Sequence, residues 1–229
     1  MTSYLKTAIL VFANSAHEEL THKPILKGEV LFEALTQDTL NKVKNSGLPY
    51  FHSSEKEQKG TSFGERFTNA IQAIFDQGFE NIITIGNDSP QLKTSHLTDA
   101  HAALTQGKTV LGPSLDGGFY LMGLHKSDFD AEGFKRLPWQ RLNLFNRISD
   151  LLAQSDCELH RLQILGDIDH FEDAKRFSGF RKSISASVLL VLTILFKTSH
   201  RISDALKELH SFLILQQPFN KGSPALLLV

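Results

Sequence analysis

Apolar runs rich in β-branched residues alternate along this chain with segments of helical periodicity, and this alternation restricts the fold more than any other feature. The clearest helical segments are residues 28–47 and 62–78, in which apolar side chains recur every three or four positions. Strands that alternate with helices of this length predict an α/β fold with a largely parallel sheet. The runs that predict strands are TAILVFAN, NIITIGND, TVLGPS, GGFYLMGL and LQILGDID.

The ends of both helical segments carry recognisable signals. Ser62 and Glu65 have the spacing of a capping box, in which each residue satisfies a backbone N–H group near the other. Gly78 and Gly47 follow the two segments, as is typical of helix C-termini.

Size and charge limit the class of protein. The chain has 229 residues, of which 41% are hydrophobic and 21% charged, as expected for one globular domain with an appendage. A net charge of -1 predicts no nucleic-acid partner. The single cysteine, Cys157, cannot form an internal disulfide, which predicts a reducing, cytoplasmic location.

The chain changes character after about residue 181. The stretch 183–196 is almost wholly apolar, and residues 203–215 have amphipathic helical spacing. We therefore expect a main domain over 1–181 and an apolar helical extension over 182–229. The first stretch is shorter than the roughly 18 residues of a membrane-spanning helix, so membrane contact is not expected. The extension is predicted to pack on the domain or on a second copy in a homodimer.

Acidic residues follow three of the predicted strands. They are Asp88 after Ile85-Gly86-Asn87, Asp116 before a glycine pair, and the neighbours Asp167 and Asp169. If the strands are parallel, these carboxylates gather at one edge of the sheet, where α/β folds bind ligands. Clustered carboxylates repel one another unless a cation neutralises them, and oxygen ligands favour Mg²⁺ or Mn²⁺. Such an ion would bridge the phosphates of a nucleotide or nucleotide sugar.

Neighbouring residues fit the same interpretation. Gly117 and Gly118 allow the backbone to approach a ligand closely. Arg66, on the predicted helix 62–78, could reach a phosphate at the same edge. Other interpretations remain open: Asp88 before Ser89 and Pro90 is typical of an ordinary turn, and strand-end acids also occur in response-regulator and phosphatase folds.

Several stretches together resemble a bacterial group of glycosyltransferase-like proteins of unknown function within the GT-A nucleotide-diphospho-sugar transferase superfamily. That group is similar to the phospholactate and molybdenum-cofactor guanylyltransferases. The resemblance covers roughly residues 6–178 and implies a three-layer α/β/α fold with a mostly parallel mixed sheet, followed here by a C-terminal helical tail. The matching stretches are AILVFAN, QKGTSFGERFTNAI, GFENIITIGNDSPQL, VLGPSLDGGFYLMGL, FKRLPWQ and GDIDHFEDAKRF.

The resemblance also implies roles for individual residues. Asp88 would be the metal-binding acid of the central GT-A motif, beside Asn87 at the nucleotide, and Asp169 with its neighbour Asp167 would supply the second acid. Asp116, Gly117 and Gly118 would shape the donor or acceptor pocket, with Asp116 as a base or acceptor-orienting group. The residues expected near the nucleotide are Gly64 and Arg66.

The chain departs from the family at the loop after the first strand. Family members often carry a basic loop that ends in V-K-T-R and grips the donor's phosphates, whereas this chain reads SAHEELTHKP, with Lys23 as the substitute.

Three functions follow from these features. The first is a metal-dependent glycosyltransferase that uses a nucleotide-sugar donor and a small-molecule acceptor, with a nucleotidyltransferase of the guanylyltransferase type as its variant. The second is a non-catalytic nucleotide-binding protein, which would be indicated if Lys23 and Arg66 both pointed away from the acids. The third is an interaction protein that associates through its apolar tail.

Overall fold

The computed structural model describes residues 6–25, 28–153, 158–179 and 183–197. The chain divides into two compact units, Met1–Leu192 and Thr193–Val229. The expected boundary at residue 181 stays a prediction, because most of the extension, including the helix expected over 203–215, lies outside the described residues. Cys157 lies outside them as well.

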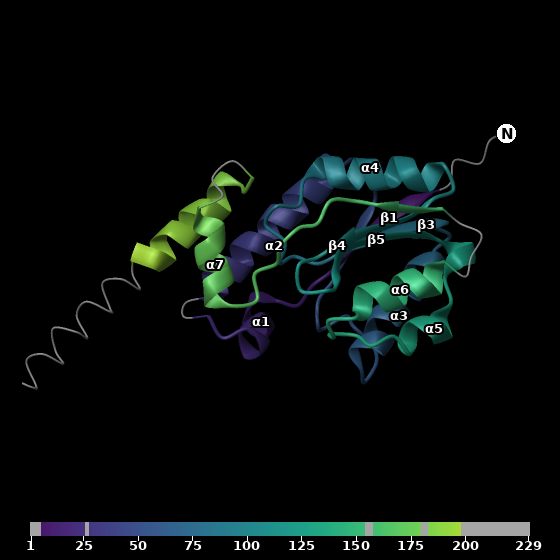
Figure 1. Cartoon of the computed structure of the whole chain (residues 1–229), viewed down its shortest axis with the longest axis horizontal. Coiled ribbons are helices and arrows are strands. Elements are labelled where there is room, and N and C mark those ends of the chain that lie inside the picture. Colours follow the sequence, from purple (N-terminus) through teal and green to yellow (C-terminus); the bar gives the residue numbers. More distant parts are fainter. Residues whose placement is uncertain (1–5, 26–27, 154–157, 180–182, 198–229) are drawn as a thin grey trace, which may run out of the picture. The chain divides into compact units, whose positions relative to one another are not determined.

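The first unit contains a β-sheet flanked by helices (Figure 1). Its strands are β1 (Thr7–Phe12), β2 (Tyr50–Ser53), β3 (Asn81–Ile85), β4 (Thr109–Pro113), β5 (Phe119–His125) and β6 (Leu159–Arg161). Its helices are α1 (Ala16–His22), α2 (Gly28–Asn45), α3 (Phe63–Phe75), α4 (Thr94–Thr105), the 3₁₀-helix η1 (Lys126–Asp128), α5 (Ala131–Lys135), α6 (Leu144–Leu152) and α7 (Phe171–Ser178).

Within the described residues the sheet has the strand order β2-β1-β3-β5-β4-β6. Strand β1 is parallel to β2 and β3, and β4 is parallel to β6. Strand β5 alone is antiparallel to both of its neighbours, β3 and β4. The expectation of a mostly parallel mixed sheet is therefore confirmed, with β5 as the reversed strand.

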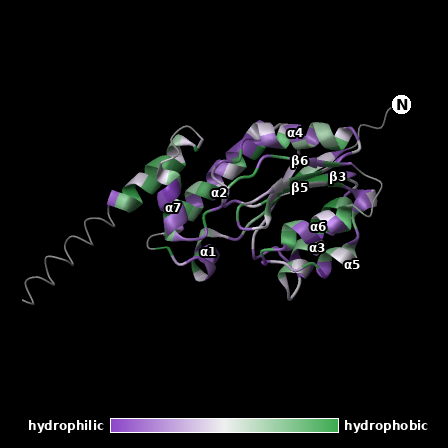
Figure 2. Cartoon of the chain, in the orientation of Figure 1, coloured by the Kyte–Doolittle hydropathy of each residue, from purple (hydrophilic) through white to green (hydrophobic). Residues whose placement is uncertain are grey.

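Helices cover both faces of this sheet (Figure 1). Successive side chains of β1 point to opposite faces: Ile9 and Val11 pack in the core under α2 and α4, and Ala8 and Leu10 pack in the core under α3 and α6. The four helices each carry both apolar and polar residues (Figure 2), as expected for elements with one buried face. The three-layer α/β/α architecture predicted from the sequence is thus confirmed.

The predicted helix termini are also confirmed. The Ser62 hydroxyl accepts a hydrogen bond from the Glu65 N–H at 3.2 Å, and the Glu65 carboxylate accepts one from the Ser62 N–H at 3.2 Å. Gly47 and Gly78 follow α2 and α3 with φ angles of 73° and 89°, in the left-handed region that suits glycine.

The prediction of a strand over LQILGDID is wrong. The last strand, β6, lies earlier, and Leu162 and Leu165 then continue along β4 with single backbone hydrogen bonds to Leu111 and Pro113. Regular pairing between β4 and β6 ends at Leu111 and Arg161, two residues before Pro113, which has no N–H to donate. The edge strand β2 had no sequence signal, since its residues are mostly exposed and not a continuous apolar run.

The apolar stretch 183–196 forms a helix over residues 186–197, in which Val188 and Leu192 are buried. Among the described residues, no helix is both long enough and apolar enough to cross a membrane.

A buried histidine lies at the start of α4. His96 is 6% exposed, and its Nδ1 accepts a hydrogen bond from the Lys93 N–H at 3.2 Å. On the other side of the ring, Nε2 lies 2.9 Å from the side-chain amide nitrogen of Gln163. Burial lowers the pKa of His96, and the positive charge of Lys93 lowers it further, against the opposing effect of Asp99.

This lowered pKa predicts an acid-sensitive contribution to stability. Below a pH of about 6.5, the unfolded chain binds a proton at this histidine while the folded chain keeps it neutral. The free energy of unfolding therefore decreases as the pH is lowered. His96→Asn keeps an acceptor for the Lys93 N–H but cannot titrate. Urea unfolding between pH 8 and pH 5 should show wild-type stability falling more steeply than that of the variant, by up to about 1.4 kcal/mol per pH unit. A gap between the two proteins that stays constant with pH would contradict this assignment.

Candidate functional site

The acids predicted from the strand ends meet at one edge of the sheet. Asp88 follows β3, and Asp116 lies in the turn between β4 and β5. Because β5 is antiparallel to β4, this turn lies at the same edge as the carboxyl ends of the other strands. Asp167 and Asp169 follow β6, and a 3.0 Å hydrogen bond from the Ile168 N–H to the Asp88 carbonyl joins their segment to the turn after β3.

These four acids line a cavity of about 850 Å³. Residues of β1, α1, α3, β3, β5 and the segment before α6 complete its wall. A volume of this size suits a small molecule as large as a nucleotide derivative.

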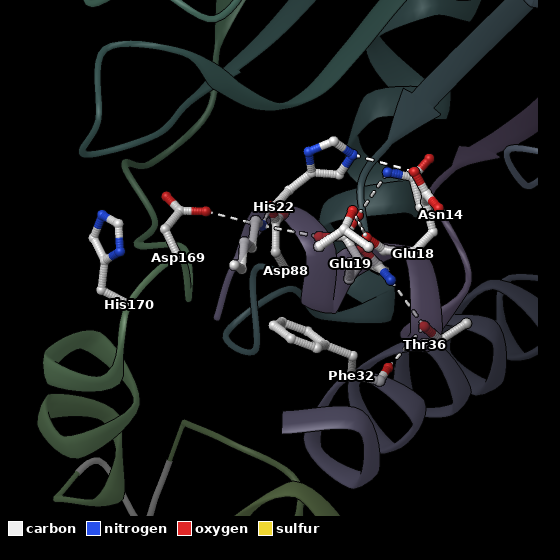
Figure 3. A network of polar contacts seen from close by, with 12 residues as sticks. Asn14, Glu18, Glu19, His22, Phe32, Thr36, Asp88, Asp169 and His170 are labelled. Carbon is white, nitrogen blue, oxygen red and sulfur yellow. Dashed lines mark hydrogen bonds and ion pairs between the residues drawn. The ribbon is translucent and has the colours of Figure 1, made fainter. Parts of the chain in front are cut away.

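A lysine ammonium lies among the acids. Lys23, directly after α1, places Nζ 2.8 Å from Asp88 Oδ2 and 2.8 Å from Asp169 Oδ1. Glu19, one helical turn earlier, adds an oxygen at 3.5 Å. Figure 3 shows Asp88, Asp169 and Glu19 turned toward the same point. Three carboxylates from three segments therefore converge on one positive charge.

The charges of this group shift one another's pKa values. Burial alone would lower the pKa of Lys23, but Asp88, Glu19 and Asp169 raise it above its usual value. Burial would raise the pKa of Asp88, yet Lys23 holds it below its usual value. Burial raises the pKa of Glu19 despite the nearby ammonium. Lys23 is thus charged at neutral pH and is paired with Asp88 and Asp169 at the same distance of 2.8 Å.

Asp167 differs from its neighbours. Its carboxyl accepts a short hydrogen bond from the Ser89 hydroxyl. Burial and the negative charges of Asp88, Asp116 and Asp169 raise its pKa to about 8, against the effect of that hydrogen bond. Asp167 therefore carries a proton through much of the neutral range.

Asp116 is held by its own turn. It accepts hydrogen bonds from the Ser114 hydroxyl and, at 3.0 Å, from the Gly118 N–H. Gly118 also lines the cavity. Gly117 has a φ of 88°, and a side chain there would meet the Leu142 carbonyl oxygen at 2.2 Å. The close contact between Gly117 and the segment containing Leu142 therefore requires a glycine here, whether or not a ligand binds.

Of the other residues predicted to lie near the nucleotide, Arg66 and Asn87 line the cavity, and Gly64 packs against Trp139. Arg66 lines the cavity and donates from Nε to Gln58 at 3.2 Å. Asn87 lines it too, but its amide donates to Thr36 of α2 at 2.8 Å. Gly64 lies beneath Trp139, whose ring would be 2.7 Å from an added Cβ atom.

Sequence reasoning missed the aromatic wall of the cavity. The ring centroid of Trp139 lies 5.3 Å from that of Phe63 and 5.0 Å from that of Phe67. The Phe119 ring centroid lies 6.1 Å from it. These four side chains line the cavity, with Phe12 beside them. The spacing of Phe63 and Phe67 predicted only a buried helix face, and nothing local placed Trp139 over them.

The mixed sheet with one reversed strand is shared with solved structures of other proteins. A structure described as a putative nucleotide-diphospho-sugar transferase from Desulfovibrio desulfuricans G20 superposes with a TM-score of 0.67 at 20% identity, covering 84% of this chain and 97% of that one. The 4-diphosphocytidyl-2C-methyl-D-erythritol synthase of Anaerococcus prevotii DSM 20548 superposes with a TM-score of 0.52 at 11% identity, covering 77% and 96%. At these identities the likeness establishes the fold alone.

The chain belongs to a family of bacterial proteins described as "Uncharacterized protein conserved in bacteria (DUF2064)", whose sequence profile matches residues 19–141. No curated protein sequence matches the chain.

Proposed function

We propose that this protein is a glycosyltransferase that binds a nucleotide-sugar donor in the acid-lined cavity and transfers the sugar to a small acceptor. One observation carries the proposal: four carboxylates from three strand ends line a cavity of about 850 Å³ whose other wall is aromatic. Acids that repel one another cost stability, so their gathering suggests a charged ligand or ion.

Asp88 and Asp169 fit a divalent cation. Each places a carboxylate oxygen 2.8 Å from one nitrogen, so the pair already converges on a single positive charge. Among the described residues, no group of three or more His, Cys, Asp or Glu side chains is arranged to hold a metal. Mg²⁺ is commonly bound by one or two carboxylates together with substrate phosphates, so two acids suffice. A bound Mg²⁺ or Mn²⁺ would neutralise charge on the leaving diphosphate.

The chain's own residues have separable roles in this proposal. Asp116, oriented by Ser114 and the Gly118 N–H, would orient the acceptor hydroxyl or accept its proton. Arg66 would contact the donor's phosphates from α3. The aromatic side chains around Trp139 would bury the flat or apolar faces of the bound molecules and exclude water.

A nucleotidyl transfer of the guanylyltransferase type is the second candidate. The same fold supports it, because the Anaerococcus prevotii protein is by its name the synthase of a diphosphocytidyl compound. The two reactions differ in their products. Sugar transfer releases a nucleoside diphosphate, whereas nucleotidyl transfer from a triphosphate releases pyrophosphate.

A non-catalytic protein would be indicated by loss of the phosphate-binding charges from the site. Lys23 contacts the acids and Arg66 lines the same cavity, so the two residues do not both point away from the acids, as a non-catalytic protein would require. The third alternative concerns a tail that lies mostly outside the described residues.

The experiment is a binding titration of the purified protein with a panel of nucleotide sugars and nucleoside triphosphates, with and without Mn²⁺. Binding of at least one nucleotide sugar, followed by release of nucleoside diphosphate when acceptors are added, would support sugar transfer. Pyrophosphate release from a triphosphate would favour the second candidate. A folded protein that binds no member of the panel would eliminate both.

A further inference from the structure

The ammonium of Lys23 occupies the position that a cation shared by Asp88 and Asp169 would take. Its nitrogen is equally distant, at 2.8 Å, from one oxygen of each acid, and Glu19 completes the group at 3.5 Å. The lysine side chain is only 17% exposed. Hydrogen bonds between charged groups at this distance are strong, and partial burial reduces their screening by salt.

The chain holds this lysine in position through an anchored helix. Ser15 caps the N-terminus of helix α1, and its N–H and hydroxyl donate to the Glu55 carboxylate at 2.7 and 2.8 Å. Glu19 is held by the Asn14 amide at 3.0 Å, and its carbonyl accepts the Lys23 N–H at 2.7 Å. Because these contacts already order the backbone around Lys23, only its side chain loses conformational entropy when the ammonium reaches the acids.

We propose that Lys23 is a tethered cation that keeps Asp88 and Asp169 together in the absence of metal and must withdraw when a divalent ion binds to them. A divalent ion held by Asp88 and Asp169 would use the same oxygens that now accept hydrogen bonds from the ammonium. Two cations cannot share these oxygens at contact distance, because their mutual repulsion in a partly buried site amounts to several kcal/mol. Lys23 therefore sets the metal affinity of the site.

This inference rests on the part of the proposed function that makes Asp88 and Asp169 the cation-binding pair. It does not depend on which group is transferred. Its test therefore uses Mn²⁺ alone, without donor or acceptor.

The experiment measures the dissociation constant of Mn²⁺ for the full chain by calorimetry and by the electron paramagnetic resonance signal of free Mn²⁺. Lys23→Met should bind Mn²⁺ more tightly than the wild type by about tenfold or more, since the competing charge is removed. Lys23→Arg keeps the charge and should show no such gain. Lys42→Met is the matched control: this lysine is 15% exposed and pairs with Asp38 at 2.5 Å, but it contacts none of the four acids.

A second measurement keeps the test valid if the Met variant is unstable. In EDTA, Lys23→Met should have a lower melting temperature than the wild type, because Asp88 and Asp169 then repel each other. Mn²⁺ should raise the melting temperature of the variant by more than that of the wild type. Adding Asp169→Asn to Lys23→Met should remove the gain in affinity.

Lys23→Met binding Mn²⁺ no more tightly than the wild type would overturn the proposal. An equal gain in Lys42→Met would also overturn it, because the effect would then come from net charge and not from position. Failure of every nucleotide sugar to bind would reject the proposed function but leave these metal affinities unchanged.

Discussion

Gly117→Ala is expected to lower the free energy of unfolding by about 2–5 kcal/mol, the sum of backbone strain and overpacking. Gly117 has a φ of 88°, and an added Cβ atom would lie 2.2 Å from the Leu142 carbonyl oxygen. The two segments cannot simply separate, because the Gly117 carbonyl accepts a hydrogen bond from the Phe145 N–H at 2.9 Å. Urea unfolding followed by circular dichroism measures the loss.

Gly78→Ala provides the matched control. Gly78 has nearly the same φ, 89°, but no atom lies within 4 Å of an added Cβ. The control should lose only the strain of the left-handed backbone, about 1–2 kcal/mol. Equal losses in the two variants would show that the segment containing Leu142 moves aside freely. Because that segment also lines the cavity, nucleotide-sugar binding should be measured on both proteins.

Asp88→Asn is expected to reduce transfer by about a hundredfold or more, as removal of a group that stabilises developing charge does in other enzymes. The substitution keeps the shape of the side chain but removes the charge that Lys23 contacts at 2.8 Å and that a divalent ion would use. Binding of the donor in the presence of Mn²⁺ should weaken by about tenfold or more for the same reason. Initial rates and calorimetry with the donor identified by the titration measure the two effects.

Asp99→Asn, an exposed change on α4, removes the same charge from the chain away from the cavity. It should leave both donor affinity and rate close to those of the wild type. If Asp88→Asn behaves like this control, Asp88 does not act at the reacting centre, and the strand-end acids would have to be explained by structure alone. Thermal unfolding of both variants separates loss of the site from loss of the fold.

The sequence by itself determined the elements whose pattern is local. Helix α3 was predicted because its apolar spacing matches 3.6 residues per turn and because Ser62 and Glu65 are close enough in sequence to cap each other. The central strands were predicted because buried strands need continuous apolar runs. Once these strands were predicted, the acids after β3 and β4 could be assigned to one edge of the sheet, because short turns keep them beside the strand ends.

Only the tertiary structure decided the features that depend on distant neighbours. Strand β2 is mostly exposed and pairs with β1 without an apolar pattern of its own. The pairing of β6 with β4 ends at Arg161 and Leu111, although the apolar run of the sequence continues beyond it. Trp139 completes an aromatic wall with rings on α3 and β5. Local sequence carries no information about such contacts.

The position of Lys23 is the clearest case. From the sequence it was a substitute for a phosphate-binding residue in a loop that departs from the family pattern. In the structure it lies against Asp88, 65 residues away along the chain, and against Asp169. Charged side chains are placed by the partners that the fold brings within hydrogen-bond distance, and those partners come from strand ends that are adjacent only in the folded sheet.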